Sequence, residues 1–169
     1  MRRPYTTIPS EGSDLRPLRV ASIGFIGAVI LAASAGLLGV QTAETRATGH
    51  GLTLTVDYAR LTRPGLATPL VIGISTEADA LPDQLTVRLS SHILEMLDLN
   101  DIEPTPQSSF SEGPWTWWTF DAPRGSRSLV VRVDARLEPA VQWGGAGIVA
   151  LEEGGVVRAT ANVSTWVLP

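Results

Sequence analysis

The chain has 169 residues and a formal net charge of −4, with 13 basic residues, all arginine, against 17 acidic ones. Because the sequence contains no cysteine, disulfide bonds, thiolate metal sites and cysteine nucleophiles are excluded. The acidic balance also argues against nucleic acid as a partner, since its phosphates would be repelled.

The N-terminal region predicts a membrane anchor. Residues 1–19 contain proline, glycine and serine without periodicity, which is typical of a flexible cytoplasmic tail. Residues 20–40 form an uncharged apolar run that, as a helix, would span roughly 31 Å, the thickness of the hydrocarbon core of a bilayer. We therefore expect a single transmembrane helix whose partner is membrane lipid. The alternative is a cleaved signal peptide, although this run is longer than the usual apolar stretch of about 7 to 15 residues.

Charges beside the apolar run indicate its orientation. Arg2, Arg3, Arg16 and Arg19 precede the run, whereas only Arg46 follows it closely. Positively charged flanks stay on the cytoplasmic side of a membrane. The sequence therefore predicts a single-pass protein of the cytoplasmic (plasma) membrane, with its N-terminus inside and its C-terminal domain outside.

Small residues recur at every fourth position of the expected helix, at Gly24, Ala28, Ala32 and Gly36. Such a stripe lets a second helix approach closely, which favours self-association or contact with another membrane protein. The simpler explanation is that alanine and glycine are common throughout this chain.

The remainder of the chain predicts a β-domain. Residues 41–50 are expected to be a polar linker, and residues 51–169 to form the extracytoplasmic domain. Alternating apolar and polar residues, or β-branched and aromatic ones, predict strands in about seven segments: 52–60, 69–76, 85–89, 115–120, 129–137, 146–152 and 156–167. The count and spacing favour an all-β, immunoglobulin-like antiparallel sandwich.

One segment departs from the strand pattern. Residues 91–103 carry apolar residues at helical spacing, which predicts one short helix, and residues 107–114 then read as a loop. Asp98, Asp101 and Glu103 cluster near the end of that helix and are weak candidates for calcium ligands. Their spacing is not that of an EF-hand, so a solvated acidic loop explains them more simply. We expect no cofactor.

The tryptophan-rich segment at 115–120 is the most unusual feature. Strand alternation places Trp115 and Trp117 on one face, and Trp118 with Phe120 on the other. One of these two pairs should be buried in the hydrophobic core. The other is either covered by a loop, placed at lipid headgroups, or used to bind a partner. Trp143 and Trp166 each stand alone in the sequence, and we expect them to lie in the core or at a sheet edge.

No catalytic motif stands out. His50 and His92 are the two histidines, and neither belongs to a metal-binding or nucleophile motif. The sequence therefore predicts a non-catalytic, membrane-anchored interaction protein, such as an accessory subunit of a membrane complex. The alternative is a module that binds carbohydrate or cell envelope through exposed tryptophans. A hydrolase with unrecognised carboxylates is the third possibility.

Overall fold

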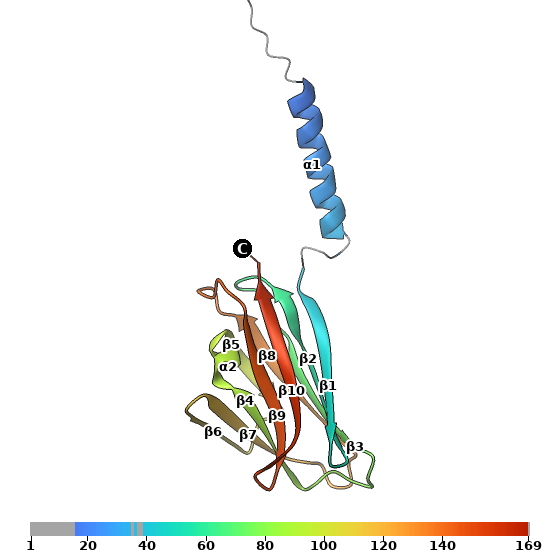
Figure 1. Cartoon of the computed structure of the whole chain (residues 1–169), viewed down its shortest axis with the longest axis vertical. Helices are drawn as coiled ribbons and strands as arrows, with labels where there is room; N and C mark the ends of the chain where they lie inside the picture. The colour runs from blue at the N-terminus through green and yellow to red at the C-terminus, as the bar shows by residue number, and fades with distance from the viewer. Residues whose placement is uncertain (1–15, 35, 37–38, 169) are drawn as a thin grey trace, which may run out of the picture. The chain divides into compact units, whose positions relative to one another are not determined.

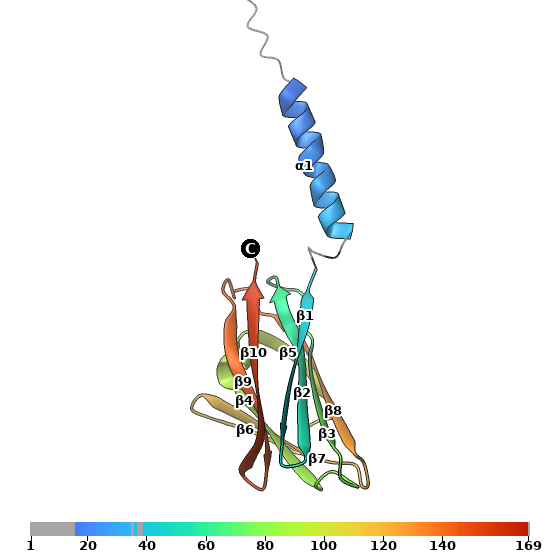
Figure 2. The ribbon, with the colours of Figure 1, turned by 45° about the vertical axis from the view of Figure 1, so that its right-hand side comes forward.

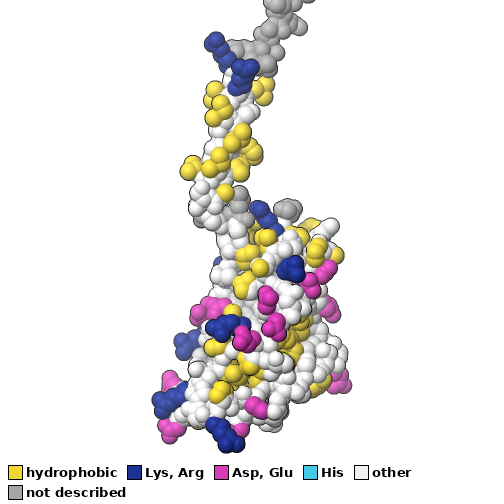
Figure 3. All heavy atoms as spheres, turned by 180° about the vertical axis from the view of Figure 1, so that it is seen from behind, with side chains coloured by type: hydrophobic (Ala, Val, Ile, Leu, Met, Phe, Trp, Pro, Cys, Tyr) yellow, Lys and Arg dark blue, Asp and Glu magenta, His cyan; other side chains and the backbone are white. Residues whose placement is uncertain are grey.

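The computed structural model describes residues 16–34, 36 and 39–168. The chain divides into two compact units, residues 1–38 and 39–169. In the first unit, α1 (Arg16–Ser34) carries exposed large apolar side chains around its surface (Figure 3). Among the described residues, no helix has both the length and the apolar character that crossing a membrane requires.

The described helix differs from the predicted one at both ends. It begins at Arg16 and ends at Ser34, whereas we expected residues 20–40. Gly24 and Ala28 are exposed on α1, but Gly36 lies beyond it in a turn with a φ of 72°. The Gly36 N–H donates a hydrogen bond to the Ala33 carbonyl at 3.0 Å. Gly36 is therefore not part of a helical stripe, and the side chain of Ala32 lies outside the described residues.

The second unit begins with a strand where the sequence predicted a linker. β1 (Gln41–Gly49) pairs antiparallel with β2 (Leu52–Thr62), and the hairpin closes at Gly49 and Leu52. His50 and Gly51 form its two-residue turn, with φ values of 53° and 77°. Positive φ at both central residues is what a type I′ hairpin turn requires. The expected polar linker is therefore part of the domain.

Eight more strands and one short helix complete this unit. They are β3 (Leu70–Thr76), β4 (Gln84–Ser90), α2 (Ser91–Glu95), β5 (Leu97–Glu103), β6 (Ser108–Glu112), β7 (Trp115–Asp121), β8 (Ser128–Leu137), β9 (Gly145–Glu153) and β10 (Val156–Val167) (Figure 1). The all-β prediction is confirmed, although the described strands number ten rather than seven.

The strands follow the order β5-β8-β3-β2-β10-β9-β4-β7-β6, with β1 paired to β2 outside this path. Neighbouring strands are antiparallel except for β2 and β10, which pair in parallel over two residues, Trp166 with Leu61 and Val167 with Thr62. Figure 2 shows β10 beside β2, where the two halves of the path meet. The result is a sandwich of two packed halves, β1-β2-β3-β8-β5 and β10-β9-β4-β7-β6.

The core lies between the two halves. In strands such as β3, β4 and β8, alternate residues face inward. The core cluster joins Leu54, Ile72 and Val131 from one half with Leu85, Val87 and Leu151 from the other. All six are 0% exposed. Burial of an aliphatic side chain of this size contributes about 1.5–3 kcal/mol. A fold without disulfides is thus stabilised by apolar packing.

Two predictions between β4 and β7 were wrong. The helix expected at residues 91–103 covers only Ser91–Glu95, and the chain then continues as β5. The loop expected at residues 107–114 contains β6, which pairs with β7. β5 and β6 belong to different halves of the sandwich and lie at the two ends of the strand path.

Candidate functional site: an aromatic face on β4, β6 and β7

β7 separates its aromatic residues between core and surface, as strand alternation predicts. Trp118 and Phe120 are 2% and 1% exposed and belong to the core. Trp115 and Trp117 are half-buried on the opposite face, which is the outer surface of this half of the sandwich. Trp118 therefore does not belong to the outer surface of β7, and of the predicted binding set only Trp115 and Trp117 lie there.

The neighbouring strand adds an aromatic residue that the sequence did not reveal. Phe110 of β6 lies directly opposite Trp117 in the register of the two strands. Their rings stack with centroids 4.7 Å apart and planes inclined by 6°. Phe110 is 52% exposed, so the stack reaches the solvent. The sequence placed Phe110 in a loop, and only the pairing of β6 with β7 brings the two rings together.

On the other side of β7, Arg88 of β4 fixes the second tryptophan. Its guanidinium carbon lies 4.5 Å from the centroid of the Trp115 ring, which is a cation–π geometry. The same guanidinium forms an ion pair with Glu152 of β9, with 3.1 Å between Nη1 and Oε1. The Glu152 side chain is 9% exposed and that of Arg88 26%, so this pair is largely removed from water.

We call Phe110, Trp117, Trp115 and Arg88 the aromatic face. Its members come from three adjacent strands, β6, β7 and β4. Each ring or guanidinium is held by a neighbour, through the stack at one side and the ion pair at the other. The arrangement offers a rigid, partly apolar surface with one shielded cation, and nothing in it supplies a nucleophile or a general base.

The acidic residues considered for calcium lie on a strand instead of a loop. Asp98, Asp101 and Glu103 are exposed on β5, where they face Arg136, Asp134 and Arg132 of β8 respectively. Within the described part of the chain, no group of three histidine, cysteine, aspartate or glutamate side chains could hold a metal ion. Cross-strand pairing therefore spreads these carboxylates along an edge.

The histidines occupy structural positions. His50 lies in the β1–β2 turn, and His92 lies on α2 with its Nδ1 3.8 Å from Glu95 Oε2. Both side chains of that second pair are more than half exposed, so the contact is a weak surface interaction.

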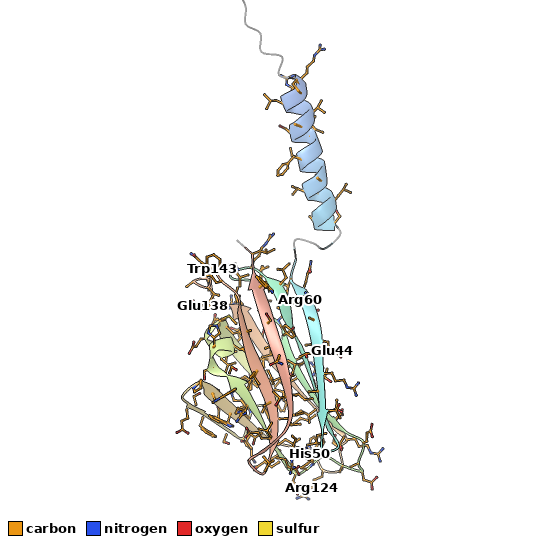
Figure 4. All side chains as sticks on the ribbon, viewed as in Figure 1. Glu44, His50, Arg60, Arg124, Glu138 and Trp143 are labelled. Carbon is orange, nitrogen blue, oxygen red and sulfur yellow. The ribbon has the colours of Figure 1, made fainter. Side chains whose placement is uncertain are left out.

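Trp143 and Trp166, predicted as core or edge residues, are instead the most exposed tryptophans. They are 83% and 67% exposed and line one surface hollow of about 370 Å³. Figure 4 shows Trp143 at the end of the sandwich where the C-terminus lies, opposite the end that holds His50 and Arg124. Trp166 pairs with Leu61, which pairs with the first residue of β1, Gln41. The two indoles thus lie at the end where the chain enters the sandwich.

Comparison with known proteins identifies no family. No family model matches the chain, and no curated protein matches it. Among solved structures, the third cohesin ScaC of Acetivibrio cellulolyticus, in complex with the ScaB dockerin, has 10% identity and a TM-score of 0.41 over 64% of this chain and 94% of that one. CaCohA2 of Clostridium acetobutylicum has 12% identity and a TM-score of 0.42, covering 63% and 84%.

A third structure, the Coh-OlpC–Doc435 cohesin–dockerin complex of Clostridium thermocellum, has 9% identity and a TM-score of 0.40, covering 64% of this chain and 89% of that one. These similarities are too distant to assign a family or a function to this chain.

Proposed function

We propose that the sandwich is a non-catalytic module that binds a partner protein through the aromatic face. The observation that carries this proposal is the outward Phe110–Trp117 stack beside Trp115 and Arg88. Tryptophan and arginine are the residues that most often dominate the free energy of protein association. Because neighbours already hold these side chains in place, little conformational entropy would be lost on binding.

Removing the stack should abolish partner binding while leaving the fold intact. In the double variant Phe110→Ala/Trp117→Ala, we expect at least a tenfold loss of the proteins retained by the full-length chain, because truncated central anchors typically cost about 2 kcal/mol or more each. The measurement is affinity capture from detergent-solubilised membranes followed by quantitative mass spectrometry. Val130→Ala, on the outer surface of the other half and 40% exposed, is the matched control.

The proposal fails if the double variant retains the same proteins as the wild type. The aromatic stack also favours a second candidate, a cell-envelope glycan, because the exposed Phe110 ring, stacked on Trp117, offers an apolar surface against which a sugar ring can pack. Retention on purified cell-wall polysaccharide, lost in the double variant and with no protein captured, would favour that candidate instead.

We also propose that residues 20–40 hold the sandwich at the cytoplasmic membrane, with the N-terminus inside and the sandwich outside, as an accessory subunit of a membrane complex. The uncharged apolar run and the exposed apolar side chains of α1 support this proposal. Trp143 and Trp166 add support, because indole rings favour the membrane–water interface and both lie at the sandwich end that follows the run in sequence.

Extraction and labelling test the membrane proposal directly. We expect the full-length protein to remain in the membrane pellet after carbonate extraction, and a C-terminal tag to react with an impermeant reagent on intact cells. Replacing two residues of the run, Ile26→Asp and Ile30→Asp, should release the protein, since each buried charge opposes insertion by about 2.5–3.5 kcal/mol. A soluble wild-type product shortened at its N-terminus would contradict the proposal.

A further inference from the structure

A groove of about 580 Å³ opens between the two halves of the sandwich, on the side where β5 and β6 lie. Residues of α2 and β5 line one side of it, and residues of the β6–β7 hairpin line the other. Figure 1 shows where these elements lie in the sandwich. Apolar side chains from both halves line it: Leu94, Leu99, Ile102 and Trp118. Hydroxyl groups accompany them, among which Ser111 and Thr116 are hydrogen-bonded at 2.8 Å. The groove is separate from the aromatic face.

Both rims of this groove are free strand edges. β5 and β6 are the two ends of the strand path, so within the described residues each has backbone N–H and C=O groups without a neighbouring strand. β5 is protected against further pairing, because a bulge interrupts it between Leu99 and Asp101 and carboxylates line it. β6 pairs with β7 without a register shift and contains no proline, lysine or arginine. Of the two edges, β6 is therefore the one open to another strand.

The hairpin geometry indicates which backbone groups of β6 are free. Glu112 and Trp115 are paired across the two-residue turn of Gly113 and Pro114. The pair that closes such a hairpin exchanges both backbone hydrogen bonds, and the pairs then alternate along the strands. Ser109 and Ser111, at odd steps from Glu112, therefore direct their N–H and C=O groups to the free edge. Their small side chains line the groove and leave room for an incoming backbone.

Charge defines the kind of strand that fits. From residue 91 to residue 118 the sequence contains five acidic residues and no arginine or lysine; the acids are Glu95, Asp98, Asp101, Glu103 and Glu112. This segment supplies the groove lining. The nearest arginine in sequence, Arg88, is already paired with Glu152. Of these acids, Glu95 lines the groove, whereas Asp98 and Glu103 lie opposite Arg136 and Arg132 on the outer face of the other half. No arginine or lysine is among the described residues that line the groove, so the lining favours a positive charge beside its apolar floor.

We propose that this groove binds an extended, positively charged peptide segment of a partner protein, which adds to the sandwich as a strand along β6. Alternate apolar side chains of the peptide would rest on the groove floor, where Glu95 also lies. The arginine or lysine side chains between them would point to the other face of β6, where Glu112 lies opposite Trp115. Backbone hydrogen bonds to Ser109 and Ser111 would hold the peptide in place, as main-chain hydrogen bonds do in other cases of strand addition. The proposal does not require the aromatic face to bind anything.

The test uses a labelled peptide of alternating arginine and valine and the full-length chain in detergent. Fluorescence anisotropy should show saturable binding that weakens as salt rises. A glutamate–valine peptide of the same length should not bind, and neither should an arginine–proline peptide, in which every second residue lacks its backbone N–H group. Ser109→Pro should weaken binding at least tenfold, whereas Ser109→Ala, which keeps the backbone donor, should bind like the wild type.

Proline is tolerated on an edge strand where its missing N–H would face solvent, so Ser109→Pro should keep the wild-type melting temperature. If that variant unfolds, amide hydrogen exchange of the wild-type protein tests the proposal instead. A saturating concentration of the arginine–valine peptide should selectively slow exchange of the Ser109 and Ser111 amides. Absence of binding by the arginine–valine peptide, equal binding by a folded Ser109→Pro variant, or unchanged exchange of these amides would each overturn the proposal. Binding that survives in Phe110→Ala/Trp117→Ala keeps the groove distinct from the aromatic face.

Discussion

Replacing Trp118 by alanine is expected to lower the free energy of unfolding by about 3–5 kcal/mol, because the substitution removes a large aromatic side chain from the core and leaves a cavity. Trp118 is 2% exposed and belongs to the main hydrophobic cluster. It also forms part of the floor of the β5–β6 groove. We therefore expect Trp118→Ala to weaken peptide binding as well as the fold.

The neighbouring residue provides the matched control. Trp117→Ala alters the same residue type on the same strand, but on the outer surface, where the ring stacks on Phe110. Cross-strand aromatic pairs contribute roughly 0.2–1 kcal/mol, so the expected loss is about 1 kcal/mol. Urea denaturation of both full-length variants measures the difference in their free energies of unfolding. Far-ultraviolet circular dichroism should follow the transition, because tryptophan fluorescence changes with the substitutions themselves. Equal losses would mean that the two faces of β7 are assigned incorrectly.

Alternation alone was sufficient to locate most of the sandwich. In β4 and β8, apolar residues alternate with polar ones, and the structure buries the apolar set. In β2 the same holds as far as Val56, after which Ala59 is buried and Tyr58 only partly so. The signal comes from the period of two that a half-buried strand imposes on its side chains. It also placed Trp115 and Trp117 together and opposite Trp118, although the sequence could not say which pair was core.

The strands that were missed lack this contrast. β1 reads QTAETRATG, with small or polar residues on both faces and no large apolar side chain. β6 reads SSFSE, and all five of its residues are exposed. An edge strand that buries little side-chain area needs little hydrophobic patterning, so its pairing is visible only once the neighbouring strand is in place.

β5 was mistaken for helix for a different reason. The helical pattern came from Ile93, Leu94 and Leu97; the first two lie on α2, whereas Leu97 is the first residue of β5. The bulge between Leu99 and Asp101 places the next apolar residue, Ile102, three positions after Leu99, so β5 does not keep the period of two that predicts a strand.

The candidate site depended on contacts that no local pattern records. Arg88 and Glu152 are far apart in the sequence and meet because β4 and β9 are adjacent. Phe110 acquires its role from its register with Trp117. The residues of the aromatic face could be suspected individually, but their combination is a property of strand order.

Loss of Arg88 is expected to be the most damaging substitution on the aromatic face. Arg88→Met removes the counter-charge of Glu152, whose side chain is 9% exposed, and the cation–π contact with Trp115. Breaking a buried ion pair from one side costs about 3–5 kcal/mol, and we expect about 3 kcal/mol because Arg88 retains 26% exposure. The loss arises mainly from the carboxylate left without a partner in a poorly hydrated site.

A double-mutant cycle separates that explanation from simple loss of packing. If the unpaired carboxylate is the main cause, Arg88→Met/Glu152→Leu should be more stable than Arg88→Met alone, because no charge is then left buried. Urea denaturation of the wild type, the two single variants and the double variant gives a coupling energy of about 1–3 kcal/mol in this case. Additive losses would show that the pair contributes through packing alone. Arg88→Met should also release Trp115 from its fixed orientation and weaken partner capture, whereas arginine–valine peptide binding along β6 should persist in any folded variant.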